Sequence, residues 1–431
     1  MTIAADATAL HARQDMRVIA AVSAAHFFSH FFQLAMAPMF PLIKDSLGVG
    51  YTELGFVMTL FYATSGLSQA FIGIWVDRYG ARPVLLGGLT LLALAVLAAG
   101  FAPSYWWLVA LAPIGGLGNS VFHPADLAIL SSKVSKPRLG RAYGAHQFMG
   151  TIGYAAAPII MGTAGLLMGW QAALIAAGVI GLIAAAVLYA MGDLLSVPGR
   201  PRALEEAEDR SMRYAALVRS PAMLMGFAFF ALAAMSGIGI SSFSVTGMHD
   251  LFDVEVSSAA QLLTAYLCAS AAGILMGGWL ADRTHRHDRV AVLGILLSGF
   301  CFLAIAFVPM AFSMVGVLFL IAGVSVGAIS PSRDMLIRAA SPEGARGKVF
   351  GLVYSGLDAG SSVAPTLFGY LIDRQMPNLM FALVAALLFL SIATVLTVKK
   401  AGAGGAQTPA PGGGPNPPPR GKSGGRPPAS A

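Results

Sequence analysis

Eight side chains that can bind a ligand or carry a proton fall inside long apolar stretches of this 431-residue chain. They are His26, His30, Gln33, His123, Asp126, Arg333, Asp334 and Asp358. An ionisable group at the centre of a bilayer costs about 2.5–3.5 kcal/mol, so each such group is a candidate functional residue. Histidine also titrates near neutral pH, which suits proton transfer. This set predicts a site for a polar substrate, for protons, or for both.

Spacing groups these side chains further. His26 and His30 are four residues apart and share one helix face with Gln33, while His123 lies one turn before Asp126 and can touch it. The alternative for the two histidines is a neutral, hydrogen-bonded pair between helices. A metal site needs further ligands, and no Cys/His/Asp cluster supplies them by spacing, so no metal is expected.

The elements that must hold these groups are membrane helices. The chain is 57% hydrophobic and only 11% charged, whereas an average soluble domain is about 25% charged. A helix needs about 20 mostly apolar residues to cross lipid. Twelve such runs lie near 18–43, 52–76, 83–102, 105–131, 142–166, 170–191, 222–247, 258–281, 290–308, 312–338, 349–372 and 377–398. The predicted fold is therefore an all-α membrane protein with twelve transmembrane helices.

Loop charge predicts the orientation. If the N-terminus is cytoplasmic, all 27 Lys and Arg except Lys44 and Arg374 lie on the cytoplasmic side. This is the positive-inside pattern, so both termini are expected on the cytoplasmic face of a bacterial inner membrane. The basic residues sit in short loops and form no continuous face. The net charge of +7 therefore does not predict nucleic-acid binding.

Composition divides the chain into five parts. Residues 1–17 form a polar cytoplasmic segment, 18–191 and 222–398 form two six-helix bundles, and 192–221 form a polar cytoplasmic linker. Residues 399–431 are rich in Gly, Pro and Ser, a composition that predicts a disordered cytoplasmic tail.

An internal repeat relates the two bundles. A shift of 207 residues superposes Pro124 on Pro331 and Ala157-Pro158 on Ala364-Pro365. The same shift places Gly153 on Gly360 and Gly162 on Gly369. Repeated six-helix bundles with a substrate site between them are a transporter architecture. The repeat predicts two pseudo-symmetric halves.

The repeat also places Asp126 opposite Arg333, with Asp334 beside it. We predict an ion pair between Asp126 and Arg333 across the two halves, which breaks as the molecule opens inward. The alternative is that each residue has local partners near the lipid headgroups. Asp358 lies about three turns into its helix, where it is expected to carry protons or to hydrogen-bond serines of the preceding span.

The loop after the second span resembles the signature loop of the major facilitator superfamily. Its pattern is Gly73-x-x-x-Asp77-Arg78-x-Gly80-x-Arg82, and a partial copy stands at Gly278, Asp282 and Arg283. The resemblance covers about residues 18–398 and implies a secondary transporter that works by alternating access.

The resemblance gives Asp77 a gating role. Because a helix N-terminus carries about half a positive charge, Asp77 is expected to latch onto the start of the eleventh helix, near 348–351, when the cytoplasmic gate closes. By symmetry, Asp282 is expected to contact the start of the fifth helix, near 141–144. The alternative is that Asp77 pairs only with Arg78 or Arg82 and aids topology.

Within that superfamily, the string Gly116-Leu-Gly-Asn-Ser-Val-Phe-His-Pro124 is most similar to the fosmidomycin-resistance group of drug exporters. The fifth helix carries a glycine/proline pattern that resembles a motif of antiporters. The residues expected to act as hinges in the fifth and eleventh helices are Gly153, Pro158, Gly162, Gly360, Pro365 and Gly369. Ordinary close packing of helices is the alternative.

The function implied by the resemblance is proton-coupled export of a small amphipathic or antibiotic-like molecule by a monomer in the lipid bilayer, without a cofactor. The alternatives are a proton-coupled uptake symporter for a small organic acid, and a transporter-like sensor or assembly protein that moves nothing. No Walker loop and no nucleophile–base set is readable, so an ATP-driven pump and an enzyme are not expected.

Overall fold

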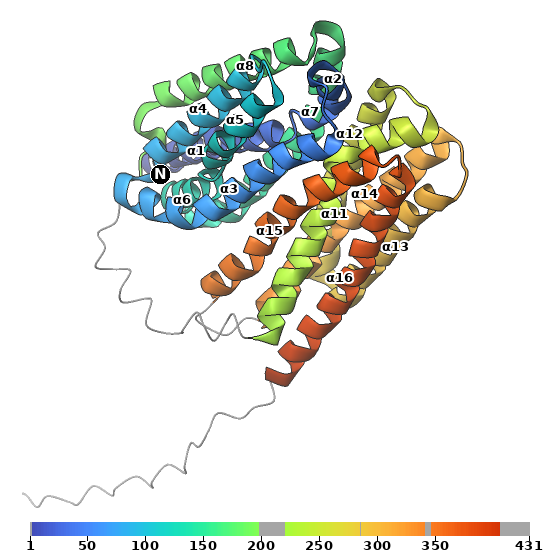
Figure 1. The fold of residues 1–431 in the computed structure, drawn as a ribbon. Helices are drawn as coiled ribbons and strands as arrows, with labels where there is room; N and C mark the ends of the chain where they lie inside the picture. Colours follow the sequence, from blue (N-terminus) through green and yellow to red (C-terminus); the bar gives the residue numbers. More distant parts are fainter. Residues whose placement is uncertain (1, 198–219, 285, 341–345, 406–431) are drawn as a thin grey trace, which may run out of the picture.

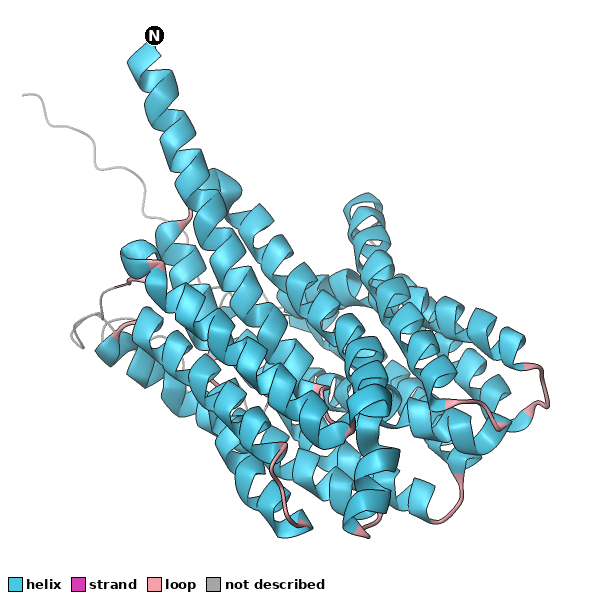
Figure 2. Ribbon diagram, turned by 90° about the horizontal axis from the view of Figure 1, so that it is seen from above, coloured by secondary structure: helices cyan, strands magenta, loops and turns pink. Residues whose placement is uncertain are grey.

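The computed structural model describes residues 2–197, 220–284, 286–340 and 346–405, and within these ranges it contains helices and no strand (Figures 1 and 2). The N-terminal half comprises α1 (Thr2–Gln33), η1 (Ala37–Met39), α2 (Phe40–Leu47), α3 (Tyr51–Tyr79), α4 (Ala81–Ala99), α5 (Tyr105–Asn119), α6 (Phe122–Lys133), η2 (Lys136–Arg138), α7 (Leu139–Met168), α8 (Trp170–Ala190) and η3 (Gly192–Leu195). The C-terminal half comprises α11 (Pro221–Phe252), α12 (Val256–Arg283), α13 (His287–Phe307), α14 (Phe312–Ala340), α15 (Arg346–Asp373) and α16 (Pro377–Gly405).

The predicted all-helical membrane fold is confirmed. Nine spans in the described chain are long and apolar enough to cross a bilayer, and α3 makes a tenth if its two parts, bent by 53°, count as one. The other two predicted spans are α5–α6, which is split into two short helices, and α15, which carries more polar residues. Each of the twelve apolar runs therefore corresponds to a helix or a broken helix.

Two boundaries differ from prediction. α1 begins at Thr2, so it includes residues 2–17 of the segment that was expected to precede it, because that segment is rich in alanine and favours a helix. α16 continues to Gly405, past the predicted start of the tail at 399. The rest of the tail and most of the linker 192–221 lie outside the described residues.

Proline accounts for the two broken spans. The first span stops at Gln33 and restarts in η1 and α2, where Pro38 and Pro41 stand in first turns, the position that proline favours in a helix. The fourth span breaks between Asn119 and Phe122, because Pro124 has no N–H to bond the carbonyl of Ser120. This second break lies where the polar residues of the fourth span are concentrated.

The two halves repeat the same packing. In the N-terminal half α1 packs on α7, α4 on α8, and α5 on both α3 and α4. In the C-terminal half the corresponding helices pair in the same way: α11 with α15, α13 with α16, and α14 with α12 and α13. The predicted pseudo-symmetry is therefore confirmed by the contacts, not only by the aligned prolines and glycines.

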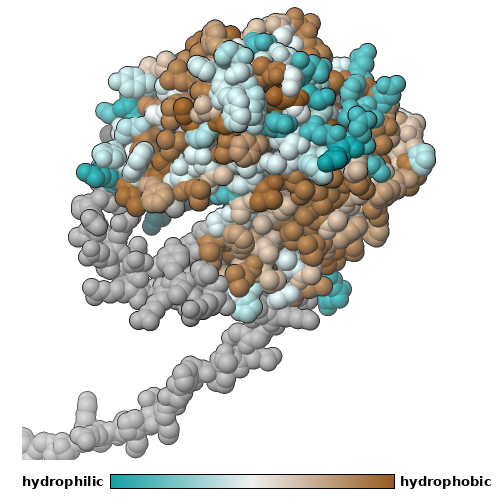
Figure 3. Space-filling model, viewed as in Figure 1, coloured by the Kyte–Doolittle hydropathy of each residue, from teal (hydrophilic) through white to brown (hydrophobic). Residues whose placement is uncertain are grey.

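The halves join at one end of the molecule, which we call the joined end. There α3 packs on α15 and α7 on α12. Thr59 and Thr366 share a hydrogen bond of 2.9 Å, and the rings of Phe40 and Phe243 lie 5.6 Å apart. At the other end, the linker end, α8 finishes and α11 begins, and the halves diverge (Figure 1). The space-filling view shows a hollow between the halves on this side, and broad apolar surface on the helices around it (Figure 3).

Candidate functional site

A buried cluster of two histidines and one aspartate lies inside the N-terminal half. Nδ1 of His26 on α1 and Nε2 of His146 on α7 lie 3.2 and 3.0 Å from the same oxygen, Oδ2 of Asp126 on α6. The rings of His26 and His146 are stacked with their centroids 3.6 Å apart. All three residues are at most 3% exposed. One carboxylate therefore joins three helices.

Two further imidazoles surround this cluster. The ring of His30 lies 4.5 Å from that of His26, and the ring of His123 lies 5.3 Å from it. His123 is exposed, whereas His26 is fully buried. The pairing of His26 with His30 on one helix face is as predicted from spacing. The cluster is thus closed on the α1–α7 side and accessible from the surface at His123.

Glycine brings α1 and α7 close enough to form the cluster. A Cβ atom at Gly150 would lie 2.8 Å from Cδ2 of His26, and one at Gly153 would fall on the carbonyl oxygen of Phe27. His146 was missed by the sequence analysis, because nothing in its distance along the chain from Asp126 indicates contact. Its position one turn before Gly150, on the same helix face, is the signal that was available.

A second polar network continues from the cluster through the N-terminal half. The hydroxyl of Tyr154, whose ring packs against His30 at 4.4 Å, donates to Oε1 of Gln33 at 2.6 Å. Nε2 of Gln33 donates to Oδ1 of Asn119 at 3.2 Å, and Asn119 in turn donates to Ser65 at 3.0 Å. The network links α7, α1, α5 and α3, so Gln33 is held at a fixed place between four helices.

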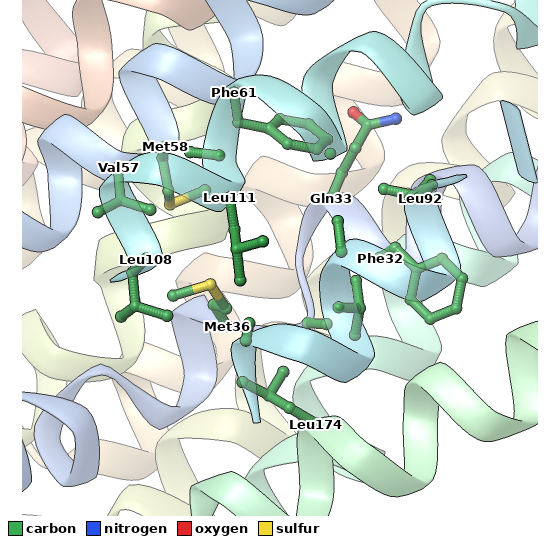
Figure 4. Close-up of a pocket in the computed structure, with 16 residues that line it drawn as sticks. Phe32, Gln33, Met36, Val57, Met58, Phe61, Leu92, Leu108, Leu111 and Leu174 are labelled. Atoms are coloured by element: carbon green, nitrogen blue, oxygen red, sulfur yellow. The ribbon is translucent and has the colours of Figure 1, made fainter. Parts of the chain in front are cut away.

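Gln33 also lines a small apolar cavity of about 70 Å³. Figure 4 shows Gln33 at the edge of a group of aliphatic and aromatic side chains, with its amide near Phe61 and Leu92. Mostly apolar walls with one polar side chain are typical of small-molecule sites, but this volume is below the roughly 300–1,000 Å³ of a drug-sized site. Gln33 was predicted from the sequence as part of a polar site. The structure shows that apolar side chains surround it, which the sequence did not reveal.

The C-terminal half has a cavity of about 170 Å³ that is lined in part by Arg333. The guanidinium of Arg333 on α14 lies 4.4 Å from the ring centroid of Phe230 on α11. Asp126 contacts histidines of its own half, so the predicted Asp126–Arg333 ion pair is not formed in this structure. The repeat explains the difference: it makes the two residues equivalent, each facing the first helix of its own half, without bringing them together. The side chain of Asp334 lies outside the described residues.

Asp358 lies where the two halves meet. Its carboxylate accepts a hydrogen bond of 3.4 Å from Nε2 of Gln69 on α3, and its Cβ faces Gly66, where any side chain would collide with it. Serines of the preceding span were one predicted set of hydrogen-bond partners for Asp358, but its carboxylate bonds Gln69 of the other half. The hydrogen bond between Asp358 and Gln69 must therefore break whenever α3 and α15 separate.

The signature loop sits at the linker end. Gly80 has φ +87°, a left-handed conformation that glycine tolerates best, and it lets α3 turn directly into α4. Nη2 of Arg82 donates to the carbonyl of Tyr189 at 2.9 Å, and Arg78 lies over the ring of Tyr79. Asp77 has no hydrogen bond or ion pair with any described residue. The side chains of Asp282 and of 348–351 fall outside the description.

The first glycine of each loop copy lies in open space, whereas the glycines of the glycine/proline patterns pack against neighbouring helices. Gly73 and Gly278 have open space around them, and Arg283 lies 4.0 Å from the ring centroid of Trp279. α7 and α15 run without a break through Pro158 and Pro365. The patterned glycines face neighbouring helices: Gly153 meets α1, Gly162 meets α12, Gly360 meets α11 and Gly369 meets α3.

Comparison with known proteins agrees with this architecture. The family model described as Major Facilitator Superfamily matches residues 22–252 and 227–428, once for each half. The chain belongs to the major facilitator superfamily. It is similar to the fosmidomycin resistance protein of Escherichia coli (strain K12), with 26% identity over 68% of this chain and 72% of the relative. It is also similar to the multi-drug resistance efflux pump PmrA of Streptococcus pneumoniae, with 25% identity over 85% of this chain and 93% of the relative.

Among solved structures, the chain resembles a bacterial homologue of the human lysosomal transporter Spinster in an inward-facing and occupied conformation. The TM-score is 0.70 at 17% identity, over 90% of this chain and 95% of the other. This likeness shows a shared fold. The chain is therefore a multi-pass membrane protein of a transporter family, which is not a family of enzymes.

Proposed function

We propose that this protein exports a small amphipathic or antibiotic-like molecule from the bacterial cytoplasm, in exchange for protons, by alternating access. Both termini and the linker end face the cytoplasm in this proposal, as the positive-inside pattern predicts. The structure then corresponds to an inward-facing state. The protein acts as a monomer, since each chain holds both halves of the transport path.

One observation carries this proposal: Asp358, an acid inside a predicted membrane span, bridges the two halves at their junction. Its contact with Gln69 exists only while α3 and α15 are together. Opening the joined end would expose the carboxylate to the outside, where it can take up a proton. Return to the inward-facing state would then allow release of that proton to the cytoplasm. A proton that enters in this way supplies the free energy for moving the substrate out.

Two observations support export of an amphipathic molecule. The cavity around Gln33 has apolar walls and one fixed amide, and the cavity around Arg333 adds a single cation to apolar walls. The relatives named for drug resistance and multi-drug efflux fit the same substrate class. Fold alone does not determine substrate, so these cavities and relatives, rather than the helical architecture, favour this class.

Asp358→Asn is expected to abolish proton-driven accumulation and to leave exchange intact, because the amide keeps the contact with Gln69 but cannot release a proton. Purified protein in proteoliposomes would be given fosmidomycin and a panel of amphipathic dyes under an imposed pH gradient. We expect gradient-driven accumulation to fall at least about tenfold, as is typical when an essential proton carrier is removed. Exchange of labelled for unlabelled probe should continue near the wild-type rate.

Glu255→Gln serves as the control, because Glu255 is an exposed acid at the joined end. It should behave as the wild type. Full gradient-driven accumulation in Asp358→Asn would show that protons couple elsewhere. Accumulation of a probe in the opposite direction would favour uptake by symport, and the absence of any movement of the probes would favour the sensor alternative.

A further inference from the structure

The cluster of His26, Asp126 and His146 has the geometry of a set of metal ligands. One nitrogen of each histidine and one carboxylate oxygen all lie within 4.8 Å of one another. The two nitrogens are 3.2 and 3.0 Å from Oδ2 of Asp126. In a tetrahedral zinc site with bonds of about 2.0–2.1 Å, ligand atoms are separated by about 3.3 Å. The ligand atoms are therefore close to the required spacing, although the stacked rings of His26 and His146 must rotate for both nitrogens to point at one ion.

A hydrogen bond of 3.0 Å joins Nε2 of His146 to Oδ2 of Asp126, but hydrogen bonding among the described residues does not account for the position of His26. Both ring nitrogens of His26 and Oδ1 of Asp126 are buried without a hydrogen-bond partner. Nδ1 of His26 lies near Oδ2 of Asp126, but not in hydrogen-bond geometry. A buried polar atom without a partner typically costs about 1–3 kcal/mol. Nδ1 of His26, which lies 3.2 Å from Oδ2 of Asp126, is the unpaired atom that an ion held by this cluster would satisfy.

We propose that His26, Asp126 and His146 bind one divalent transition-metal ion such as Zn²⁺, Co²⁺ or Ni²⁺. Two imidazoles and one carboxylate are borderline ligands that suit these ions, whereas Mg²⁺ and Ca²⁺ prefer sites made of oxygen atoms. The fourth position is filled by water or by an imidazole of His30 or His123. This inference does not depend on the substrate or on the coupling proposed above.

The location of the ligands indicates that the ion stays bound to the protein and is not transported. All three ligands come from α1, α6 and α7, which belong to one half. The site therefore stays intact when the two halves move relative to each other. Gly150 leaves room for the ring of His26, and the exposed His123 lies next to the cluster on its open side. A bound ion would hold the broken fourth span against α1 and α7.

Metal binding can be measured directly on the full-length protein in detergent. The protein would be purified with a tag that contains no histidine, stripped with a chelator and titrated with Co²⁺, followed by competition with Zn²⁺. We expect one equivalent per chain and the visible absorption bands of four-coordinate Co²⁺. Asp126→Asn preserves the shape of the side chain and should lower the affinity for Co²⁺ about 100-fold or more. Substitution of residues that only orient metal ligands already lowers metal affinity about 10–100-fold, and Asp126 is a ligand itself.

His249→Gln is the matched control, because Nδ1 of His249 lies 2.7 Å from the carbonyl of Val254, in the C-terminal half and away from the cluster. It should bind Co²⁺ as the wild type does. His146→Gln provides a second test if Asp126→Asn does not fold, and a size-exclusion profile would establish folding for both. Absence of stoichiometric Co²⁺ and Zn²⁺ binding by the wild type, or equal binding by the wild type and both variants, would overturn the proposal. Loss of transport with metal binding intact would count only against the proposed function.

Discussion

Gly55→Leu is expected to reduce transport about tenfold or more while leaving the protein folded in the membrane. A Cβ atom at Gly55 would fall on the carbonyl oxygen of Pro365, and one at Gly369 would fall on that of Tyr51. The backbones of α3 and α15 are thus in direct contact at the joined end. Overpacking of a close contact typically costs about 1–3 kcal/mol, which is enough to displace an equilibrium between two conformations. The leucine side chain would hold the joined end apart and prevent the inward-facing state.

Two measurements test this expectation. Transport would be assayed in proteoliposomes, and access to the joined end by thiol labelling of Thr59→Cys in a background where Cys268 and Cys301 are replaced by serine. Labelling should increase as transport falls. Gly87→Leu is the control, because Gly87 on α4 is exposed and has open space where a side chain would be added. Normal transport by Gly55→Leu would mean that this helix contact is dispensable.

The sequence was sufficient for the membrane fold because lipid imposes a simple demand on each helix. Every span needs a long apolar run, and both the run and the charges at its ends are local properties. The breaks at Leu34–Met36 and at Ser120 were not predicted, because each covers only a few residues inside a long apolar run, and hydropathy is averaged over about 19 residues. Hydropathy therefore located the spans but not their internal interruptions.

The candidate site was predicted in part, and for physical reasons. His26, His30 and Gln33 share a helix face, which spacing alone reveals. His146 joins Asp126 only through the packing of α7 on α1, which no spacing encodes. The repeat correctly indicated that Asp126 and Arg333 are equivalent, but equivalence under pseudo-symmetry places two residues in separate halves. Contact between the halves comes instead from α3 with α15, through residues such as Asp358.

Asp373→Asn is expected to shift the protein toward the state that is open at the joined end. Asp373 is the last residue of α15, and its carboxylate accepts hydrogen bonds from the backbone N–H groups of Tyr51 at 2.7 Å and Thr52 at 2.6 Å. The hydroxyl of Thr52 donates to it as well, at 2.5 Å. These are the unpaired N–H groups at the start of α3, where the helix dipole favours a negative charge. The acid thus fastens one half to the other.

The amide lacks the charge and one acceptor oxygen, so the joined end should open more often. We expect the ratio of the two conformations to change about tenfold, since a charged hydrogen bond at an exposed helix end contributes about 1–2 kcal/mol. Distances between spin labels on the two halves would report the shift. Asp253→Asn is the control, because Asp253 caps α11 at the same end and its left-handed backbone accommodates asparagine. A distance distribution unchanged by Asp373→Asn would refute the latch.

The distances between spin labels also test the gating role of Asp77, because its substitution should shift the two conformations in the direction opposite to Asp373→Asn. Asp373 ends α15 and caps the start of α3, while Asp77 lies near the linker end of α3 and is expected to cap the start of α15 in the other state. If both acids act as latches, Asp77→Asn should favour the linker-open state that this structure shows, and Asp373→Asn should oppose it. The double variant should return the ratio close to that of the wild type, because two independent contributions of opposite sign add. A shift of both single variants in the same direction would mean that Asp77 acts within its own half, through Arg78 or Arg82, and does not form a gate.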